Sequence, residues 1–448
     1  MEIAVLPILL GAVGVYFLIK LRLFLILHPI RTFCRGMRSM RDKRVLRSFM
    51  LALAGTLGVG NVFGVAIAII IGGPGSILWL LVSMIFAMVI KYAEVVISSD
   101  NLYHDTDTHG GFFYVIRASF KKTGKVLSLI YAAVTVLISF ILGASLQVNA
   151  AKQTVTSVLD IPVGVIAIAS LLITALAVIG GATKIEKITS ILIPLTTVIY
   201  IISTLIVIFS NFSRISSVIE AVVKGALFSH SIYGGALGFL TSKAVSEGFA
   251  RGLLSNEAGA GTSSMAHARS GVINPASAGI FGIFEVWFDT GVICLLTGLS
   301  ILLSVPDIDM FSEGMQIVMY AVGSCLGSGG KLAIVLCVLA FAYATVICWY
   351  YYGSESWGAL FGARRRVYFT PLFLLFVCLG SFFDSALLVS ATDVLLTVAT
   401  VLTLLTLIKN SDRIRDLSES GGIIDSDKLK VRKFGIKAGG FWTGGRHR

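Results

Sequence analysis

The feature that most constrains this chain is a stretch at residues 48–90 that contains no Asp, Glu, Lys or Arg. A helix that spans a membrane needs about 20 apolar residues, so this stretch is too long for a single span. The sequence Gly72-Gly73-Pro74-Gly75 divides it, because a Pro flanked by glycines cannot continue a helix. The stretch therefore predicts two apolar helices joined by a tight turn.

Apolar runs of this kind recur along the whole chain, which is 56% hydrophobic and only 13% charged. A soluble domain carries about 25% charged residues, so this surface must face lipid, where only helices and closed barrels satisfy the backbone. The runs exceed the roughly 10-residue strands of a barrel. We therefore expect an all-α polytopic membrane protein with about eleven spans. They are expected at residues 2–19, 49–72, 76–99, 126–151, 161–182, 188–210, 217–242, 277–304, 332–355, 367–384 and 387–408.

The distribution of Lys and Arg predicts the orientation, because cytoplasmic loops are enriched in these residues. Residues 20–47 carry nine of them and residues 409–448 carry ten, so both segments are expected inside the cell and the N-terminus outside. The net charge of +12 is thus interpreted as a topology signal and not as a nucleic-acid surface. The segment 20–47 is either a connector along the membrane or a specific lipid-binding helix.

Two of the expected spans contain clusters of glycine that favour a break inside the membrane. Residues 54–61 read AGTLGVGN, and residues 229–238 read SHSIYGGALG. Each Gly in a helix interior costs roughly 0.5–1 kcal/mol relative to Ala, so several together favour unwinding. Close helix packing through small residues would explain either cluster alone.

The positions of the two clusters suggest an internal repeat. The ten spans after the first divide into two sets of five, and each cluster lies in the first span of its set. We expect a first span with its basic connector (1–47), a first repeat (48–213), a second, inverted repeat (214–408) and a basic cytoplasmic tail (409–448). Interrupted helices at matching places in inverted halves predict a transporter binding site. Freed N–H groups suit a carboxylate, and unwound carbonyls suit a sodium ion.

Four stretches, spread over residues 48–400, resemble the alanine/glycine:cation symporters, or sodium:alanine symporter family. They are GVGNVFGVA at 58–66 followed by GGPG at 72–75 and KYAE at 91–94; GGFFY at 110–114; RGLLSNEAGAG at 251–261 followed by AHA at 266–268; and FAYAT at 341–345 followed by Trp349. The resemblance implies a LeuT-type fold, a 5+5 inverted repeat preceded by one extra span. It also implies sodium-coupled symport of small neutral amino acids, chiefly alanine and glycine, across the cell membrane.

The resemblance also implies which residues form the site. The substrate is expected to contact Gly58, Val59, Gly60, Asn61, Gln147, Gly234, Gly235, Thr345 and Trp349. The sodium ion is expected near Thr56, Leu57, Asn61 and Thr345. Gln147 could instead form a hydrogen bond between helices, and Trp349 could belong to an aromatic belt at the membrane interface.

The chain departs from the family pattern at positions that concern the ion. Val59 stands where the family usually has Thr, and Ala344 replaces the first of two adjacent hydroxyl residues. Hard cations prefer oxygen ligands, so these changes keep open a proton-coupled or ion-independent carrier with the same fold.

Charged residues within spans are further candidates, because each costs roughly 2.5–3.5 kcal/mol at mid-bilayer on insertion scales. We interpret Glu94 as an interfacial ion pair with Lys91, and Asp289 as a tie between helices; Asp393 is interpreted in the same way. Glu257 and His267 are expected in the cytoplasmic stretch between the seventh and eighth spans, which is interpreted as a gate or a connector. These groups are too scattered to indicate a membrane enzyme, so no catalytic residue is expected.

Overall fold

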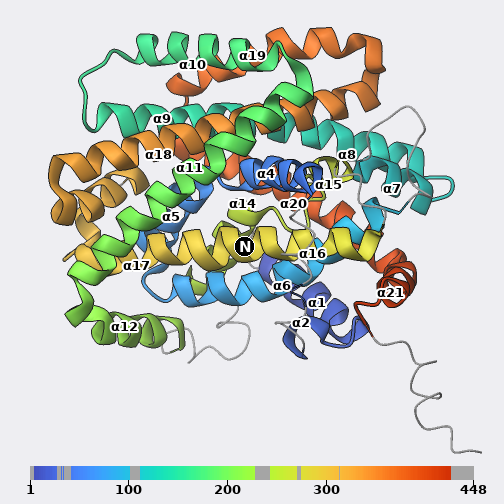
Figure 1. Cartoon of the computed structure of the whole chain (residues 1–448), viewed down its shortest axis with the longest axis horizontal. Coiled ribbons are helices and arrows are strands. Elements are labelled where there is room, and N and C mark those ends of the chain that lie inside the picture. Colours follow the sequence, from blue (N-terminus) through green and yellow to red (C-terminus); the bar gives the residue numbers. More distant parts are fainter. Residues whose placement is uncertain are drawn as a thin grey trace, which may run out of the picture.

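The computed structural model describes residues 5–27, 32, 34, 42–100, 111–227, 243–269, 274–311 and 313–424. Every regular element within these ranges is a helix, which confirms the all-α prediction. Figure 1 shows long helices that run along the longest axis of the molecule, in several layers.

The first helices contain the expected break. The chain begins with α1 (Val5–Lys20) and α2 (Phe24–Leu27), followed by α4 (Lys43–Thr56), the 3-10 turn η1 (Val59–Asn61), α5 (Phe63–Gly72) and α6 (Ser76–Ser98). Residues 45–56 and 59–72 form one apolar pair bent by 58°. The glycine cluster at 54–61 therefore interrupts the helix as predicted, and Gly73, with φ of 73°, ends α5.

The next helices complete the first half. They are α7 (Phe112–Ser119), α8 (Gly124–Ile138), η3 (Ser139–Leu146), α9 (Gln147–Thr156), α10 (Val163–Val178), α11 (Gly181–Ser210) and η4 (Phe212–Arg214). The segments α8, η3 and α9 form one continuous helix, in which η3 has π-helical hydrogen bonding. Such π segments occur frequently at functional sites.

The second half also contains a helix with a π-helical segment. It contains α12 (Ile215–Leu227), α14 (Lys243–Asn256), α15 (Ser264–Ala268), α16 (Pro275–Val286), the π segment η6 (Trp287–Cys294), α17 (Leu295–Ser304), η7 (Ile308–Met310) and α18 (Gly314–Phe361). The chain continues through η8 (Ala363–Tyr368), α19 (Phe369–Leu379), η9 (Gly380–Phe382), α20 (Ser385–Lys409) and α21 (Ser411–Ser420). Gly327, with φ of 61°, kinks α18.

The packing places the α4–α5 break at the centre of the molecule. Helix α6 packs against α14 and α16, while α11 packs against α18, and α18 packs against α8 and α9. Helix α4 contacts α11, α16 and α18. In Figure 1, α4 and α5 accordingly lie between the layer of α6 and α16 and the layer that contains α9 and α18, with α10 and α19 beyond the latter.

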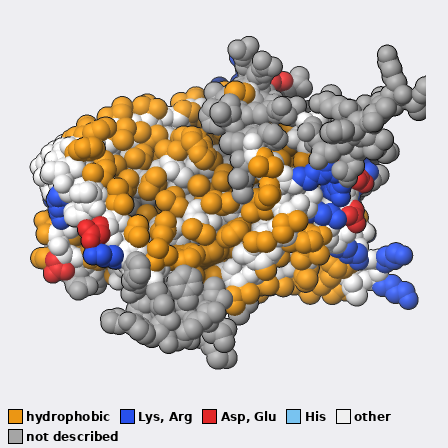
Figure 2. Space-filling model, turned by 90° about the horizontal axis from the view of Figure 1, so that it is seen from below, with side chains coloured by type: hydrophobic (Ala, Val, Ile, Leu, Met, Phe, Trp, Pro, Cys, Tyr) orange, Lys and Arg blue, Asp and Glu red, His pale blue; other side chains and the backbone are white. Residues whose placement is uncertain are grey.

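The surface is that of a membrane protein. In Figure 2, apolar side chains cover the middle of the visible face, and charged side chains gather at its two ends. Among the described residues, seven helices are long and apolar enough to cross a membrane, or eight if the bent pair α4–α5 is counted as one span. Helices α1 and α10 are apolar but shorter. The chain is thus a multi-pass membrane protein. By length and apolar composition, the described helices do not account for all eleven expected spans.

The structure differs from the expectation at residues 243–276, which were assigned to a cytoplasmic connector. Helix α14 and α15 instead lie in the buried interior, against α4, α5 and α6. Hydropathy did not identify α14 because this helix carries the charged residues Glu247 and Arg251. In the structure Arg251 forms ion pairs with both Glu247 and Asp393. The expected seventh span, 217–242, is represented by α12 in its first part; the rest, with the cluster at 229–238, lies outside the described residues.

A second break does occur in the described part of the chain, between α14 and α15. Residues 257–263 are not helical there, and Glu257, Gly259 and Gly261 have φ of 52°, 91° and 75°. Positive φ suits glycine, so the two glycines of the SNEAGAG stretch permit a backbone that other residues rarely adopt. The last turn of α14, just before this break, packs close to η1, since a Cβ added at Gly60 would lie 3.2 Å from the Leu254 carbonyl oxygen.

The first part of the expected basic tail forms α21, which is attached to the rest of the molecule by ion pairs. Arg413 Nε lies 2.7 Å from Asp100 Oδ2, and Lys20 Nζ lies 2.5 Å from Asp412 Oδ1. Residues 425–448 lie outside the described residues.

Candidate functional site

The break after α4 frees backbone N–H groups that side chains then bind. Helix α4 ends at Thr56. The N–H of Gly58 donates to Asn61 Oδ1 at 3.1 Å, and the N–H of Val59 donates to Gln147 Oε1 at 3.2 Å. Both acceptors are amide oxygens, and both side chains are buried. The break is thus a place where buried N–H groups meet oxygen acceptors.

Gly58 is the point at which three helical segments meet. A Cβ added there would lie 2.6 Å from Thr345 Oγ1 and 3.0 Å from Gln147 Oε1, distances too short for real Cβ contacts. The Thr345 hydroxyl donates to the carbonyl oxygen of Ala54 at 2.9 Å, so it also serves the unpaired C-terminal end of α4. The break, α9 and α18 therefore converge on one glycine.

Trp349 lies one helical turn beyond Thr345 on α18 and is completely buried. A Cβ at Gly143, on the facing segment η3, would clash with the Trp349 side chain. The indole ring stacks edge-on with Tyr352, with 5.5 Å between ring centroids. Trp349 therefore fills the interior next to the Gly58–Gln147–Thr345 contact, and its burial argues against a place in an interfacial belt.

Asn61 connects the first break to the second one. Its amide nitrogen donates to the Asp289 carboxylate and, at 2.9 Å, to Ser255 Oγ. The Ser255 hydroxyl also donates to Asp289, and Thr290 Oγ1 donates to Asp289 Oδ2 at 3.0 Å. Asp289 thus joins η1, α14 and η6 through side-chain hydrogen bonds, which agrees with its interpretation as a tie between helices.

The structure brings together most of the site residues that the sequence singled out. Gly58, Val59, Asn61, Gln147 and Thr345 lie in direct contact with one another through the hydrogen bonds and close approaches above. Sequence reasoning missed Ser255. Its signal was a polar residue at the end of α14, in the same SNEAGAG stretch that was already recognised.

Three of the expected residues contribute fewer polar contacts to the site than the others. The Thr56 hydroxyl turns back to the Leu53 carbonyl oxygen, at 3.4 Å, and Leu57 donates its N–H to the same carbonyl, at 2.6 Å. Gly60 approaches the α14 backbone without a polar side chain to offer. Gly234 and Gly235 lie outside the described residues.

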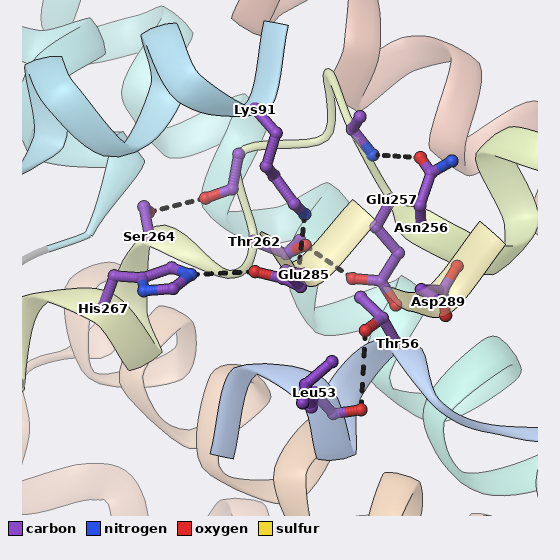
Figure 3. A network of polar contacts seen from close by, with 12 residues as sticks. Leu53, Thr56, Lys91, Asn256, Glu257, Thr262, Ser264, His267, Glu285 and Asp289 are labelled. Carbon is purple, nitrogen blue, oxygen red and sulfur yellow. Dashed lines mark hydrogen bonds and ion pairs between the residues drawn. The ribbon is translucent and has the colours of Figure 1, made fainter. Parts of the chain in front are cut away.

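A second polar network lies deeper in the molecule, between α6, the second break and α16 (Figure 3). Lys91 Nζ lies 3.2 Å from Glu285 Oε1, and His267 Nε2 lies 2.8 Å from Glu285 Oε2. Thr262 donates to Glu257 Oε2 at 2.7 Å. Two expectations are corrected here. Lys91 pairs with Glu285 in the interior rather than with Glu94 at an interface, and Glu257 and His267 are buried rather than in a connector.

A third cluster holds α14 against α20. Arg251 bonds to Glu247 at 3.2 Å and to Asp393 Oδ2 at 2.6 Å, so Asp393 ties helices as expected. These three side chains line a cavity of about 330 Å³ together with residues of α5.

The fold and site together define a multi-pass helical membrane protein with a buried polar site at a helix break. The fold resembles that of the manganese transporter of Eremococcus coleocola, determined in complex with an aromatic bis-isothiourea compound. The TM-score is 0.50 at 15% identity, over 87% of this chain and 83% of that one.

A family model described as the sodium:alanine symporter family matches residues 1–417, and the chain belongs to this family. The chain is 30% identical to the sodium/alanine symporter AgcS of Methanococcus maripaludis, over 71% of each chain. It is 28% identical to a protein of Bacillus subtilis named "Probable sodium/glutamine symporter GlnT", over 81% of this chain and 76% of that protein. The resemblance inferred from the four motifs is thereby confirmed.

Proposed function

We propose that this protein is a sodium-coupled symporter of small neutral amino acids, alanine and glycine, which works by alternating access in the cell membrane. The observation that carries the proposal is the contact of Gly58, Gln147 and Thr345 at the first break. In a symporter of this kind, the substrate carboxylate would take over the N–H groups of Gly58 and Val59 that Asn61 and Gln147 now bind. The Gln147 amide would remain beside it as a donor.

The sodium ion would use oxygen atoms of the same region. The Ala54 carbonyl, which already accepts from the Thr345 hydroxyl at 2.9 Å, the Thr345 oxygen itself and Asn61 Oδ1 are oxygens at the break. Sodium, like other hard cations, is held by carbonyl, hydroxyl and carboxylate oxygens. In the proposed orientation, the N-terminus lies outside the cell and α21 inside.

The first test is the uptake of radiolabelled alanine into proteoliposomes, with sodium outside and then with sodium replaced by choline. We expect uptake only with sodium, because the ion would supply the driving force for accumulation. Uptake of equal rate in both buffers would exclude sodium coupling and favour a proton-coupled or ion-independent carrier, for which Val59 and Ala344 are the motivating residues. Absence of uptake in both buffers would reject alanine as the substrate.

Trp349 is proposed to limit the size of the substrate side chain, since it fills the space next to the site. We expect Trp349→Ala to take up larger neutral amino acids such as glutamine at least about tenfold faster than the wild type, which corresponds to about 1.4 kcal/mol. Competition by unlabelled glutamine against labelled alanine measures this change.

The control is Trp357→Ala, which removes an aromatic side chain of the same α18 helix that packs on Phe361 and Phe369 instead. This variant should keep the wild-type preference. Because the loss of a buried Trp destabilises a protein by about 3–5 kcal/mol, Trp349→Phe should be measured in parallel. An unchanged preference in both Trp349 variants, with normal alanine uptake, would reject the role of Trp349.

A further inference from the structure

Figure 3 shows part of a buried network that contains more negative than positive groups. Its carboxyl groups are those of Glu94, Glu257, Glu285 and Asp289, and its basic groups are Lys91 and His267; all are at most 2% exposed. With every carboxyl ionised, the four negative charges exceed the two basic groups even if His267 is protonated. Buried charges must be paired or neutralised, so at least one carboxyl group is expected to hold a proton.

The hydrogen bonds distinguish the four carboxyl groups. Glu285 has both oxygens within reach of basic groups, Lys91 and His267. Asp289 accepts from the side chains of Asn61, Ser255 and Thr290. Glu257 accepts from the Thr262 hydroxyl. Each of these three carboxyl groups thus has a side-chain partner.

Glu94 differs from the other three. It is completely buried, and no side chain donates a hydrogen bond to either of its oxygens. Its polar neighbours are the backbone groups of Gly259 and Gly261, in the second break. The proton that the network requires is therefore best placed on Glu94.

The ionisable groups that face Glu94 come from several helices. Lys91 lies one turn away on α6 and attracts it, while Glu285 on α16 repels it. Tyr131 on α8 faces Glu94 and Glu257 together, and its hydroxyl donates to the Ala260 carbonyl oxygen at 2.6 Å. The remaining ionisable groups near the network are Glu257, His267, Asp289, Cys348 and Tyr352.

Glu94 has a short connection to the site at the first break. The segment that carries Gly259 and Gly261 follows the last turn of α14, where the Ser255 hydroxyl contacts both Asn61 and Asp289. An ionised Glu94 would attract the N–H groups of this segment, whereas a protonated one would release them. A movement of the second break on substrate binding would therefore change the proton affinity of Glu94.

We propose that Glu94 is a proton-binding site that exchanges one proton with water during the transport cycle, in addition to the sodium ion. The proposal rests on the proposed function for its link to alanine. Only the O–H bond of the carboxyl group is broken and re-formed, and the proton goes to water.

Infrared difference spectroscopy of the purified full-length protein, between mildly acidic and mildly alkaline buffer, tests this site directly. We expect a carbonyl stretch of a protonated carboxylic acid that shifts in heavy water. Glu94→Gln should abolish the band, and Glu94→Asp should keep it at a shifted position. Glu220→Gln is the control, because Glu220 lies exposed on α12 beside Lys224, and it should leave the band unchanged. The same band should change in amplitude when alanine and sodium are added together.

The outcomes separate the two proposals. A wild type without a protonated-acid band, or a band that survives in Glu94→Gln, would overturn the assignment of the proton to Glu94. If the amplitude of the Glu94 band does not change when alanine and sodium are added, in protein that takes up alanine, the proposed proton exchange during transport is overturned. If the protein takes up no alanine, the proposed function fails, while the pH-dependent band still reports on the proton site.

Discussion

Replacement of Gly58 by Ala is expected to reduce sodium-driven alanine uptake about ten- to a hundredfold. The added Cβ would lie 2.6 Å from Thr345 Oγ1 and 3.0 Å from Gln147 Oε1, so it would push apart the residues that form the proposed site. Overpacking of a dense interior costs typically about 1–3 kcal/mol, and each 1.4 kcal/mol is a factor of about ten. Initial rates of alanine uptake in proteoliposomes, at matched protein amounts, measure the loss.

Gly64→Ala is the matched control for Gly58→Ala. Gly64 lies in the adjoining helix α5, and a Cβ there would meet the Leu254 and Arg251 side chains at the ordinary contact distances of 3.4 and 3.9 Å. This variant should transport at nearly the wild-type rate. Equal rates for Gly58→Ala and wild type would show that the substrate does not bind at the first break.

Replacement of Asp289 by Ala is expected to destabilise the folded protein and to abolish uptake. The change removes the acceptor that the Ser255 and Thr290 hydroxyls share in the interior, while Asn61 keeps its bond to Ser255 Oγ. Each buried donor left unpaired costs about 1–3 kcal/mol, so the free energy of unfolding should fall by at least about 2 kcal/mol. Thermal unfolding in detergent, followed by tryptophan fluorescence, measures this effect.

The companion variant is Asp384→Asn. Asp384 is exposed and caps α20 by accepting the N–H of Leu387 at 3.0 Å, and Asn caps a helix about as well as Asp. Its melting temperature should therefore match that of the wild type. An Asp289→Ala variant with a wild-type melting temperature would show that Asp289 does not hold the two breaks together.

The sequence was sufficient for the features that depend on local composition. The uncharged stretch at 48–90 and the glycines at 54–61 predicted two helices and an internal break, and the bend of 58° lies there. The four motifs predicted the family to which the chain belongs. Such features follow from helix propensity and hydropathy, which a short window of residues determines.

The sequence was not sufficient for the second break. The glycines at 229–238 lie outside the described residues, while the break between α14 and α15 falls in a segment assigned to a connector. Lys243, Glu247 and Arg251 lower the hydropathy of α14. Hydropathy counts each charge as exposed to lipid, but here a neighbouring helix, α20, supplies Asp393 as a partner for Arg251.

The sequence alone therefore determined that this chain is a helical membrane protein and which family it belongs to, and it predicted Gly58, Asn61, Gln147 and Thr345 as site residues. Only the tertiary structure decided which groups these residues contact. Asn61 lies 194 residues from Ser255 and 228 residues from Asp289 along the chain. A pattern within one segment carries no information about which distant helix packs against it, so the pairing of buried polar groups is settled by the packing of the whole bundle.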